Sequence, residues 1–217
     1  MKQFTKAVGG MRNSVIYTDA DRRHFRFSEG TWAWRNHNPG NVYPKQHGKF
    51  TNQIGKTHNF AIFSDDQSGH EALIKVLSTT YANSSIDQMI VKYAPPDCNP
   101  TEKYRRFLHK QTGVSDNTKI KNFTKSQFEK LWEAIQRMEG YKPGKITEVY
   151  QITGVQKTGK NLYQYCFIEG EWITEVECIN FAKQGKVELE VCLSHLGNIF
   201  LRSPPSSSFQ RRLGDLM

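Results

Sequence analysis

Apolar side chains recur at helical spacing in three stretches between residues 65 and 140. In the last stretch, residues 124–140, they fall at i, i+3, i+7 and i+10, at Phe128, Leu131, Ile135 and Met138. This spacing places them on one face of a helix. The same reasoning predicts helices over residues 65–82 and 85–94, and the boundary residues Asn99, Pro100 and Gly113 predict one over residues 99–113. Polar residues at the expected starts, Pro100 at a first helical position and glycines at the expected ends mark the boundaries.

The pattern changes after residue 145. Residues 148–168 and 186–203 read as strands joined by turns, which predicts two β-hairpins. Residues 169–185 predict a helix that ends at Gly185. Between Trp32 and Phe63 the chain is rich in turn residues, with one strand-like alternation in the sequence NFAIF. The first part of the chain is therefore expected to be helical and the last part rich in strands.

The segment GYKPGK, Gly140–Lys145, separates these two patterns, because two glycines and a proline interrupt regular structure. We expect an α+β protein with two domains. Residues 1–145 would form a mostly helical domain with a small β or loop lobe. Residues 146–217 would form a small, β-rich α+β module.

The two parts also differ in charge. Residues 1–145 contain 23 Lys and Arg against 13 Asp and Glu, whereas residues 146–217 contain 7 against 8. The formal net charge of the whole chain is +9. A basic surface attracts polyanions, among them nucleic acid, anionic membranes and the bacterial cell wall. Charge alone does not choose among these three partners.

The chain shows no targeting or membrane signal. It has no run of about 18 apolar residues, so no membrane insertion is expected. The first residues have no continuous apolar core of the kind that a secretory signal contains. We therefore expect a protein made in the cytoplasm without a signal peptide, which another route must deliver if it acts elsewhere.

The segment RNHNPGN, Arg35–Asn41, is the most unusual stretch of the sequence. It places Asn36, Asn38 and Asn41 within six residues. Asparagine favours turns, which accounts for part of this composition. Side-chain amides also both donate and accept hydrogen bonds, as sugar hydroxyls and N-acetyl groups require. We expect at least one of these amides to bind a ligand and the others to hold the loop.

A candidate acid precedes this loop. Glu29 is followed by Trp32 and Trp34. Cleavage of a glycoside needs a proton donor for the leaving oxygen, and apolar surroundings keep a carboxyl group protonated near neutral pH. A carboxyl group beside aromatic side chains and amides therefore suits a polysaccharide site.

Three motifs carry a resemblance to a known family. AWRNHNPGNV, FAIFSDDQSGHEAL and YAPPDCNPTEKY occur in order between about Ser28 and Gly113. They resemble the lysozyme-like peptidoglycan hydrolase domain of phage structural proteins and of type VI and Rhs-linked antibacterial toxins. His37 departs from the family pattern, which commonly has asparagine there, and Cys98 stands where glutamate is common. The last 70 residues resemble a small uncharacterised α+β domain, which suggests a binding or adaptor role.

The layout is also similar to that of flagellar-type glucosaminidases. This resemblance implies that Glu29 is the general acid and that Tyr104 lines the cleavage subsite. The residues expected to shape the sugar subsites are Asn36, Asn38, Asn41, Phe60 and Tyr104. Asp65 and Asp66 are candidates for a second carboxylate, and their alternative role is to cap the following helix.

The resemblance implies cleavage of the peptidoglycan glycan strand, without a metal or other cofactor. An enzyme of this kind would act in the periplasm or cell wall of a target bacterium, as an antibacterial effector or a phage-associated lysin. A component of a secretion apparatus or virion would then deliver it, and an immunity protein would protect a producing cell. The bond cut and the type of product stay open.

Two other functions are compatible with the sequence. His37, His47 and His58 together with the basic charge raise the alternative of a metal-dependent nuclease. Their gaps of 10 and 11 residues do not match the tight spacing of common metal sites, so nucleic acid is the less favoured partner. The other alternative is a structural protein that binds the cell wall without cutting it.

Overall fold

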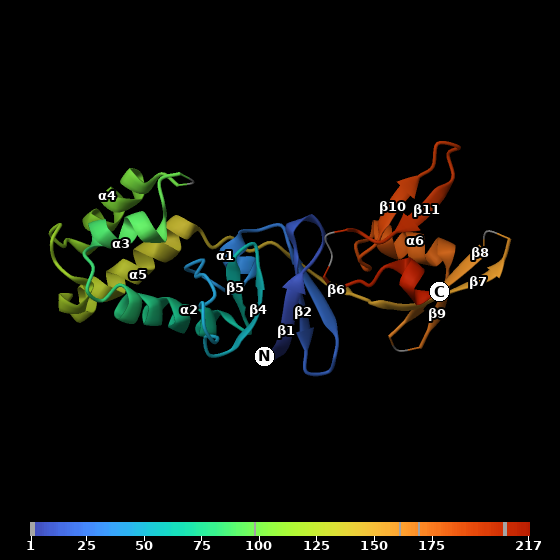
Figure 1. Ribbon diagram of the computed structural model, residues 1–217, viewed down its shortest axis with the longest axis horizontal. Coiled ribbons are helices and arrows are strands. Elements are labelled where there is room, and N and C mark those ends of the chain that lie inside the picture. The colour runs from blue at the N-terminus through green and yellow to red at the C-terminus, as the bar shows by residue number, and fades with distance from the viewer. Residues whose placement is uncertain (1–2, 98, 161, 169, 206–207) are drawn as a thin grey trace. The chain divides into compact units, whose positions relative to one another are not determined.

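The computed structural model describes residues 3–97, 99–160, 162–168, 170–205 and 208–217 (Figure 1). Its contacts group the chain into two compact units. The first unit comprises Met1–Glu29, Ile54–His58 and Gly144–Met217, and the second comprises Gly30–Gln53 and Asn59–Pro143. The second unit ends close to the domain boundary expected at residue 145. Residues 1–29, however, are grouped with the C-terminal residues.

The second unit contains most of the helices. They are α1 (Trp32–Arg35), α2 (Asp66–Lys75), α3 (Ile86–Tyr93), α4 (Thr101–Thr112) and α5 (Lys125–Glu139). A π-helical turn, Val76–Thr80, continues α2, and a short 3-10 helix, Ile120–Asn122, precedes α5. The four predicted helices are confirmed. Ser85 and Thr124 form capping boxes at the starts of α3 and α5, and Gly113 ends α4 in the left-handed conformation.

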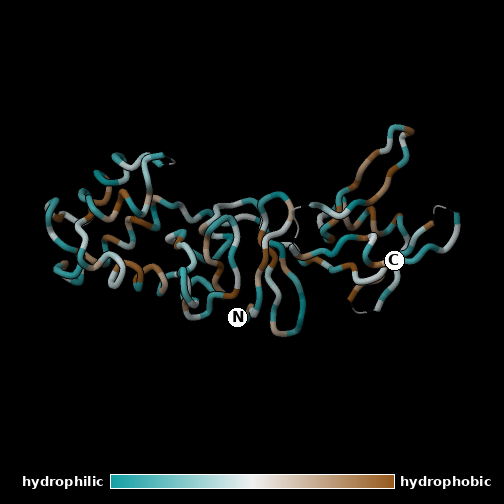
Figure 2. The backbone as a smooth tube through the Cα atoms, viewed as in Figure 1, coloured by the Kyte–Doolittle hydropathy of each residue, from teal (hydrophilic) through white to brown (hydrophobic). Residues whose placement is uncertain are grey.

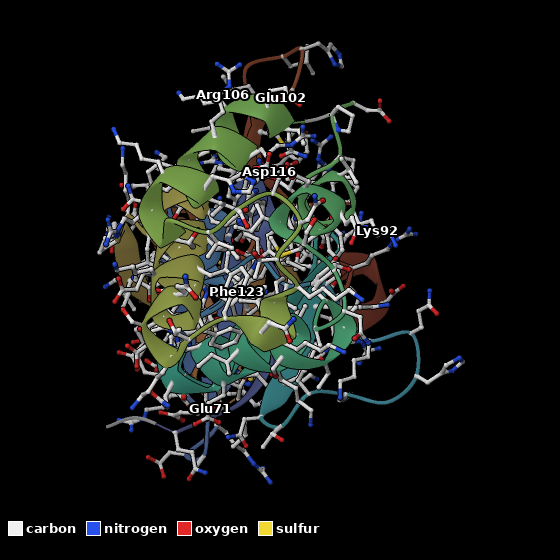
Figure 3. The ribbon with its side chains drawn as sticks, turned by 90° about the vertical axis from the view of Figure 1, so that its left-hand side faces the viewer. Glu71, Lys92, Glu102, Arg106, Asp116 and Phe123 are labelled. Atoms are coloured by element: carbon white, nitrogen blue, oxygen red, sulfur yellow. The ribbon has the colours of Figure 1, made fainter. Side chains whose placement is uncertain are left out.

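The apolar faces of these helices form one core. Hydrophobic positions recur among hydrophilic ones along the helices, as expected of amphipathic helices (Figure 2). The most deeply buried side chains of this core include Leu73, Leu77, Met89, Ile90, Leu108 and Leu131. In Figure 3, Glu102 and Arg106 extend from α4 and Lys92 from α3, away from this core.

The first unit begins with a four-stranded antiparallel sheet that the sequence pattern did not predict. Its strands are β1 (Phe4–Gly9), β2 (Val15–Asp19), β3 (His24–Ser28) and β6 (Lys145–Val149), and they pair in the order β1-β2-β3-β6. A 3-10 turn, Met11–Asn13, connects β1 to β2. The partner of β3 lies about 120 residues farther along the chain, with His24 opposite Val149. Pairing at this separation leaves no local signal in the sequence.

The rest of this unit follows β6. β7 (Ile152–Gly159), β8 (Leu162–Phe167) and β9 (Trp172–Thr174) form an antiparallel sheet, and β10 (Glu190–Leu193) pairs with β11 (Ile199–Arg202). Helix α6 spans Glu175–Lys183, and a 3-10 turn, Leu213–Leu216, closes the chain. Both predicted hairpins are confirmed. The predicted helix starts six residues later than expected, because Thr174 caps it and the residues before Thr174 form β9.

A further two-stranded sheet contains β4 (Gln53–Thr57) and β5 (Phe60–Phe63), where the sequence predicted an alternating strand. No helix within the described ranges is long and apolar enough to cross a membrane.

The expected fold class needs correction. The protein is α+β, but it is 35% helix and 27% strand with four small antiparallel sheets. The expectation of a mostly helical, lysozyme-like domain over residues 1–145 is therefore wrong. The physical reason is the N-terminal sheet, in which Val15, Tyr17, Phe25 and Phe27 bury their side chains through strand pairing and not on a helix face.

Candidate active site

The amide-rich segment Arg35–Asn41 begins at the last residue of the short helix α1, and it is buried except for the half-buried Asn41. Thr31 caps α1, since its Oγ1 accepts a hydrogen bond from the Trp34 amide at 3.4 Å. The Asn38 amide donates to Ala33 O at 2.8 Å, which turns the chain directly after the helix. The Phe63 amide donates to Asn36 O at 3.0 Å and thereby ties the segment to β5. The loop is thus a folded part of the core and not a flexible excursion.

Asn38 holds this loop together. Its Nδ2 donates to Val42 O and to Ala61 O, both at 2.9 Å, and its Oδ1 accepts from the Val42 amide at 2.8 Å. The side chain is completely buried. Its amide is therefore occupied by the backbone, and we assign it a structural role.

Replacing Asn38 with alanine is expected to lower the free energy of unfolding by about 2–4 kcal/mol. The change removes three hydrogen bonds and leaves buried backbone groups without a partner, each at a cost of roughly 1–3 kcal/mol that is only partly additive. Denaturant unfolding of the variant measures this loss. The exposed Asn117 supplies the control, because Asn117→Ala is expected to change stability by less than about 0.5 kcal/mol. Equal losses for both variants would contradict the structural role of Asn38.

Glycines allow the helices to approach the loop closely. A Cβ atom on Gly40 would lie 2.7 Å from Leu73 Cδ1 and 3.0 Å from the Tyr93 hydroxyl. A Cβ atom on Gly69 would lie 1.9 Å from the backbone oxygen of His37. The Tyr93 hydroxyl also donates a hydrogen bond to Gly40 O. The loop is therefore fixed between α2 and α3.

Glu139, the last residue of α5, is the carboxyl group at the centre of this arrangement. Its Oε2 accepts a hydrogen bond from Asn41 Nδ2 at 2.9 Å, and its Oε1 accepts from the Tyr104 hydroxyl at 3.0 Å. Burial raises the pKa of Glu139, and the two hydrogen bonds offset part of this rise. A carboxyl group with a raised pKa keeps its proton to a higher pH than an exposed glutamate, and the two donors stabilise the anion after it loses the proton.

An aromatic groove adjoins this carboxyl group. It has a volume of about 380 Å³, and Asn41, Tyr43, Tyr81 and Tyr93 are among its lining residues. Tyr43 stacks on Phe60, with ring centroids 5.5 Å apart and planes inclined by 10°. Asn41 both lines the groove and hydrogen-bonds to Glu139, so it links the groove to the acid. Pockets of roughly 300–1,000 Å³ with few polar groups typically bind small ligands.

Neither a family model nor a curated protein sequence matches this chain. The chemistry of the site therefore has to be inferred from its own geometry.

The structure brings together several of the predicted site residues. Asn41 and Tyr104 meet at Glu139, and Phe60 supports Tyr43 at the groove. Asn36 is completely buried, and its side-chain amide has no hydrogen-bond partner within the described part of the chain. The contribution of Asn36 to a ligand site stays a prediction.

Glu29 belongs to the first unit, whereas the residues just described belong to the second. Its side chain is exposed and its backbone is left-handed, with φ of 60°. It lines a pocket of about 220 Å³ together with Arg12 and Arg26. Its role as the general acid stays a sequence-based prediction.

Asp65 and Asp66 have structural partners. Asp65 caps α2, since its Oδ1 accepts from the Ser68 amide at 2.8 Å and its Oδ2 from the Ser64 hydroxyl at 2.6 Å. Burial by itself raises the pKa of Asp65, but the hydrogen bonds from Ser64 and Ser68 outweigh it, so the net pKa is lowered. Asp66 is exposed and accepts a hydrogen bond from the Tyr141 hydroxyl. These contacts support the capping alternative for Asp65.

Glu139 was not among the site residues expected from the sequence. A negatively charged residue at the C-terminal end of a helix is opposed by the helix dipole, which favours Lys or Arg there. This local conflict is a signal that could have drawn attention to it. Cys98, the other departure considered in the motif region, lies outside the described residues.

A second polar cluster lies between α3 and α4. Asp87, His109 and Asp116 are the three side chains within the described ranges that are close enough to share a metal ion. They do not include His37, His47 or His58. Arg105 Nε already lies 3.3 Å from Asp87 Oδ1. Because a guanidinium cation is in contact with the cluster, we interpret it as an ion-pair network.

His109 is expected to make stability depend on pH. Burial lowers its pKa, but hydrogen bonds from Nδ1 to Val114 O at 2.9 Å and between Nε2 and Asp87 at 3.2 Å outweigh it, so the net pKa is raised above 6.5. The protonated ring thus stabilises the fold. This contribution is complete below the unfolded-state pKa of about 6.5 and is lost as pH rises through the folded-state pKa.

The comparison of wild type with His109→Gln by denaturant unfolding between pH 5 and pH 9 measures this effect. The stability difference should be largest at pH 5 and should disappear at high pH. Asp87→Asn should reduce the pH dependence, because it removes the carboxylate that faces Nε2. A difference that is constant, or that grows with pH, would rule out this account.

Proposed function

We propose that the chain cleaves the glycan strand of peptidoglycan, with Glu139 as the proton donor. The observation that carries the proposal is the partly buried Glu139 carboxyl group, which has a raised pKa and is held by Asn41 and Tyr104 beside an aromatic groove. The neutral acid donates its proton to the glycosidic oxygen, and the bond between that oxygen and the anomeric carbon breaks.

The two neighbours of Glu139 assist this step. When the proton leaves, Asn41 Nδ2 and the Tyr104 hydroxyl donate hydrogen bonds to the new carboxylate. The carboxylate can then take a proton from the water molecule that completes hydrolysis. Burial raises the pKa of Tyr104, and the nearby Tyr93 and Glu139 raise it further, so its hydroxyl stays protonated and keeps donating.

The proposal does not require a second carboxylate. N-acetylated sugars can supply the internal nucleophile from their own acetamido group, as substrate-assisted enzymes use it. Asp65 is engaged in capping α2, which fits a mechanism with one acidic side chain. The aromatic rings of the groove offer apolar faces on which a sugar ring can pack.

The positive charge of the protein suits a negatively charged substrate. The net charge of +9 favours association with an anionic cell wall. We infer that the protein acts in the periplasm or cell wall of a target bacterium, as an antibacterial effector or a phage-associated lysin. An effector that attacks its own kind requires a neutralising immunity protein in the producer. If no neighbouring gene, when co-expressed, protects cells against the toxicity of this protein, the effector role would be contradicted.

Release of soluble fragments from dye-labelled peptidoglycan sacculi tests the proposed activity. The purified chain, in the presence of a metal chelator, should solubilise the dye. Parallel reactions with plasmid DNA and with RNA, supplied with magnesium, test the nuclease alternative. Sedimentation of sacculi with bound protein but no dye release would instead support a wall-binding structural protein. Degradation of nucleic acid without dye release would overturn the proposal.

A further inference from the structure

We propose that the groove beside Glu139 selects the carboxylate-bearing muramyl unit of the glycan strand, through Lys45 and Lys92. This inference rests on the proposed function and identifies how the same site recognises its substrate. The glycan strand of peptidoglycan alternates a neutral N-acetylglucosamine with a muramyl residue, whose lactyl group carries either a free carboxylate or a peptide that ends in carboxylates.

The charges lining the groove are positive. Lys45 and Lys92 are the charged side chains among its described lining residues, and no carboxylate is among them. Neither lysine forms a salt bridge with a residue in the described ranges. Both side chains are exposed, and Figure 3 shows Lys92 extending outward from α3. The two cations are thus available to an anionic ligand.

The two lysines come from different elements that meet at the groove. Lys92 belongs to α3, in the sequence position directly before Tyr93. Lys45 follows the loop that carries Asn41, and its Nζ lies 4.7 Å from the centre of the Phe50 ring. A cation held over an aromatic face keeps a preferred position. Lys45 is therefore held at the groove, and Lys92 adds a second, exposed positive charge.

An exposed aromatic ring lines the same groove as these cations. Tyr43 is 55% exposed although it is large, and Phe60 supports its ring by stacking. A supported, exposed ring can pack on a sugar while the lysines contact the acidic substituent of the same sugar. Asn41 then connects this subsite to Glu139. A neutral polymer such as chitin would use the ring but not the cations.

Ligand binding to the full-length Glu139→Gln protein tests this inference, because this variant should hold a glycan without cutting it. Calorimetric titration would compare three ligands. They are a muramyl disaccharide with its stem peptide, the same disaccharide with a free lactyl carboxylate, and the neutral N-acetylglucosamine disaccharide. The first two ligands distinguish the two sources of carboxylate.

The double substitution Lys45→Met and Lys92→Met should weaken binding of a carboxylate-bearing ligand roughly 5- to 20-fold, as expected for two exposed ion pairs. Binding of the neutral disaccharide should not change. The loss should shrink in 0.5 M salt, since salt screens exposed charges. Lys75→Met and Lys103→Met, at exposed positions of α2 and α4, are the matched controls and should have no effect.

Failure of the inference and failure of the proposed function give different results. If the lysine variants bind all three ligands as tightly as the parent, or lose the neutral ligand equally, the inference is overturned while sacculus cleavage by wild type continues. If wild type releases no fragments from sacculi and Glu139→Gln binds none of the three ligands, both are overturned.

Discussion

Replacing Glu139 with glutamine is expected to lower the rate of glycan cleavage by about 100- to 10,000-fold, the range that a positioned general acid contributes. Glutamine keeps the shape of the side chain and can still form hydrogen bonds with Asn41 and Tyr104, but it cannot donate a proton to the leaving oxygen. Binding of the substrate should change little. The loss should therefore appear in kcat and not in KM, measured with a soluble glycan fragment.

Substitutions of two other glutamates serve as the control and as the test of the alternative acid. Glu133 lies on the same helix, has a side chain that is 45% exposed and pairs with Arg137 at 3.4 Å, so Glu133→Gln should retain full activity. Glu29→Gln tests the acid that the sequence resemblance implied. A large loss with Glu29→Gln and full activity with Glu139→Gln would transfer the role of proton donor to Glu29.

The pH dependence follows from the direction of the Glu139 pKa shift. Because burial raises this pKa, the protonated and active form persists to higher pH than for an exposed glutamate, and activity falls as pH rises through it. The hydrogen bonds from Asn41 and Tyr104 stabilise the charged form and lower the pKa. Tyr104→Phe should therefore shift the falling limb of the profile to higher pH.

Gly69→Ala is expected to destabilise the protein by about 3 kcal/mol, at the upper end of the usual cost of overpacking. In most helices this substitution stabilises by about 1 kcal/mol, because glycine loses more backbone entropy than alanine. Here the new methyl group would meet the backbone oxygen of His37 at 1.9 Å and the Pro39 ring at 3.0 Å. A backbone atom cannot rotate away as a side chain can, so α2 or the amide-rich loop has to move.

Thermal and denaturant unfolding measure this loss. Glu71 is exposed on the same helix, and Glu71→Ala should change stability by less than about 0.5 kcal/mol. Displacement of the loop should also lower activity in Gly69→Ala at temperatures where the protein is still folded. An unchanged or higher melting temperature would contradict the close packing of α2 on the loop.

Local sequence features predicted the helices well. Ser85 and Thr124, each followed three residues later by glutamine, form the capping boxes that begin α3 and α5. Gly113 ends α4 as expected, whereas Pro100 is the residue before the helix and not its first residue. Both kinds of signal act within one or two turns of helix, so they can be read without knowledge of the rest of the fold.

Such local signals could not predict the N-terminal sheet. β3 pairs with β6, and Phe27 lies opposite Ile146. In the sequence, the whole second unit lies between these two residues. The buried Val15 and Tyr17 lie on β2, which pairs with the other side of β3. A domain boundary placed at a turn-rich segment cannot show that the chain returns to its own first strands after the turn.

Only part of the candidate site could be predicted, because the rest depends on contacts between residues far apart in the sequence. The amide-rich composition of Arg35–Asn41 identified the loop, and Asn41 and Tyr104 were among the predicted residues. Glu139 lies 98 residues from Asn41 and 35 from Tyr104, and its contact with them depends on the packing of α4 and α5. In the sequence it is one of several glutamates on an amphipathic helix.

The most direct test of the central claim is mass spectrometry of the products from purified peptidoglycan, digested in the presence of a chelator by wild type and by Glu139→Gln. We expect disaccharide-peptides from wild type and, in the same digestion time, at least about 100-fold less from Glu139→Gln, and the sugar at the new chain end would identify the bond that is cut. Equal release of these fragments by both proteins, or no fragments from wild type, would contradict this claim.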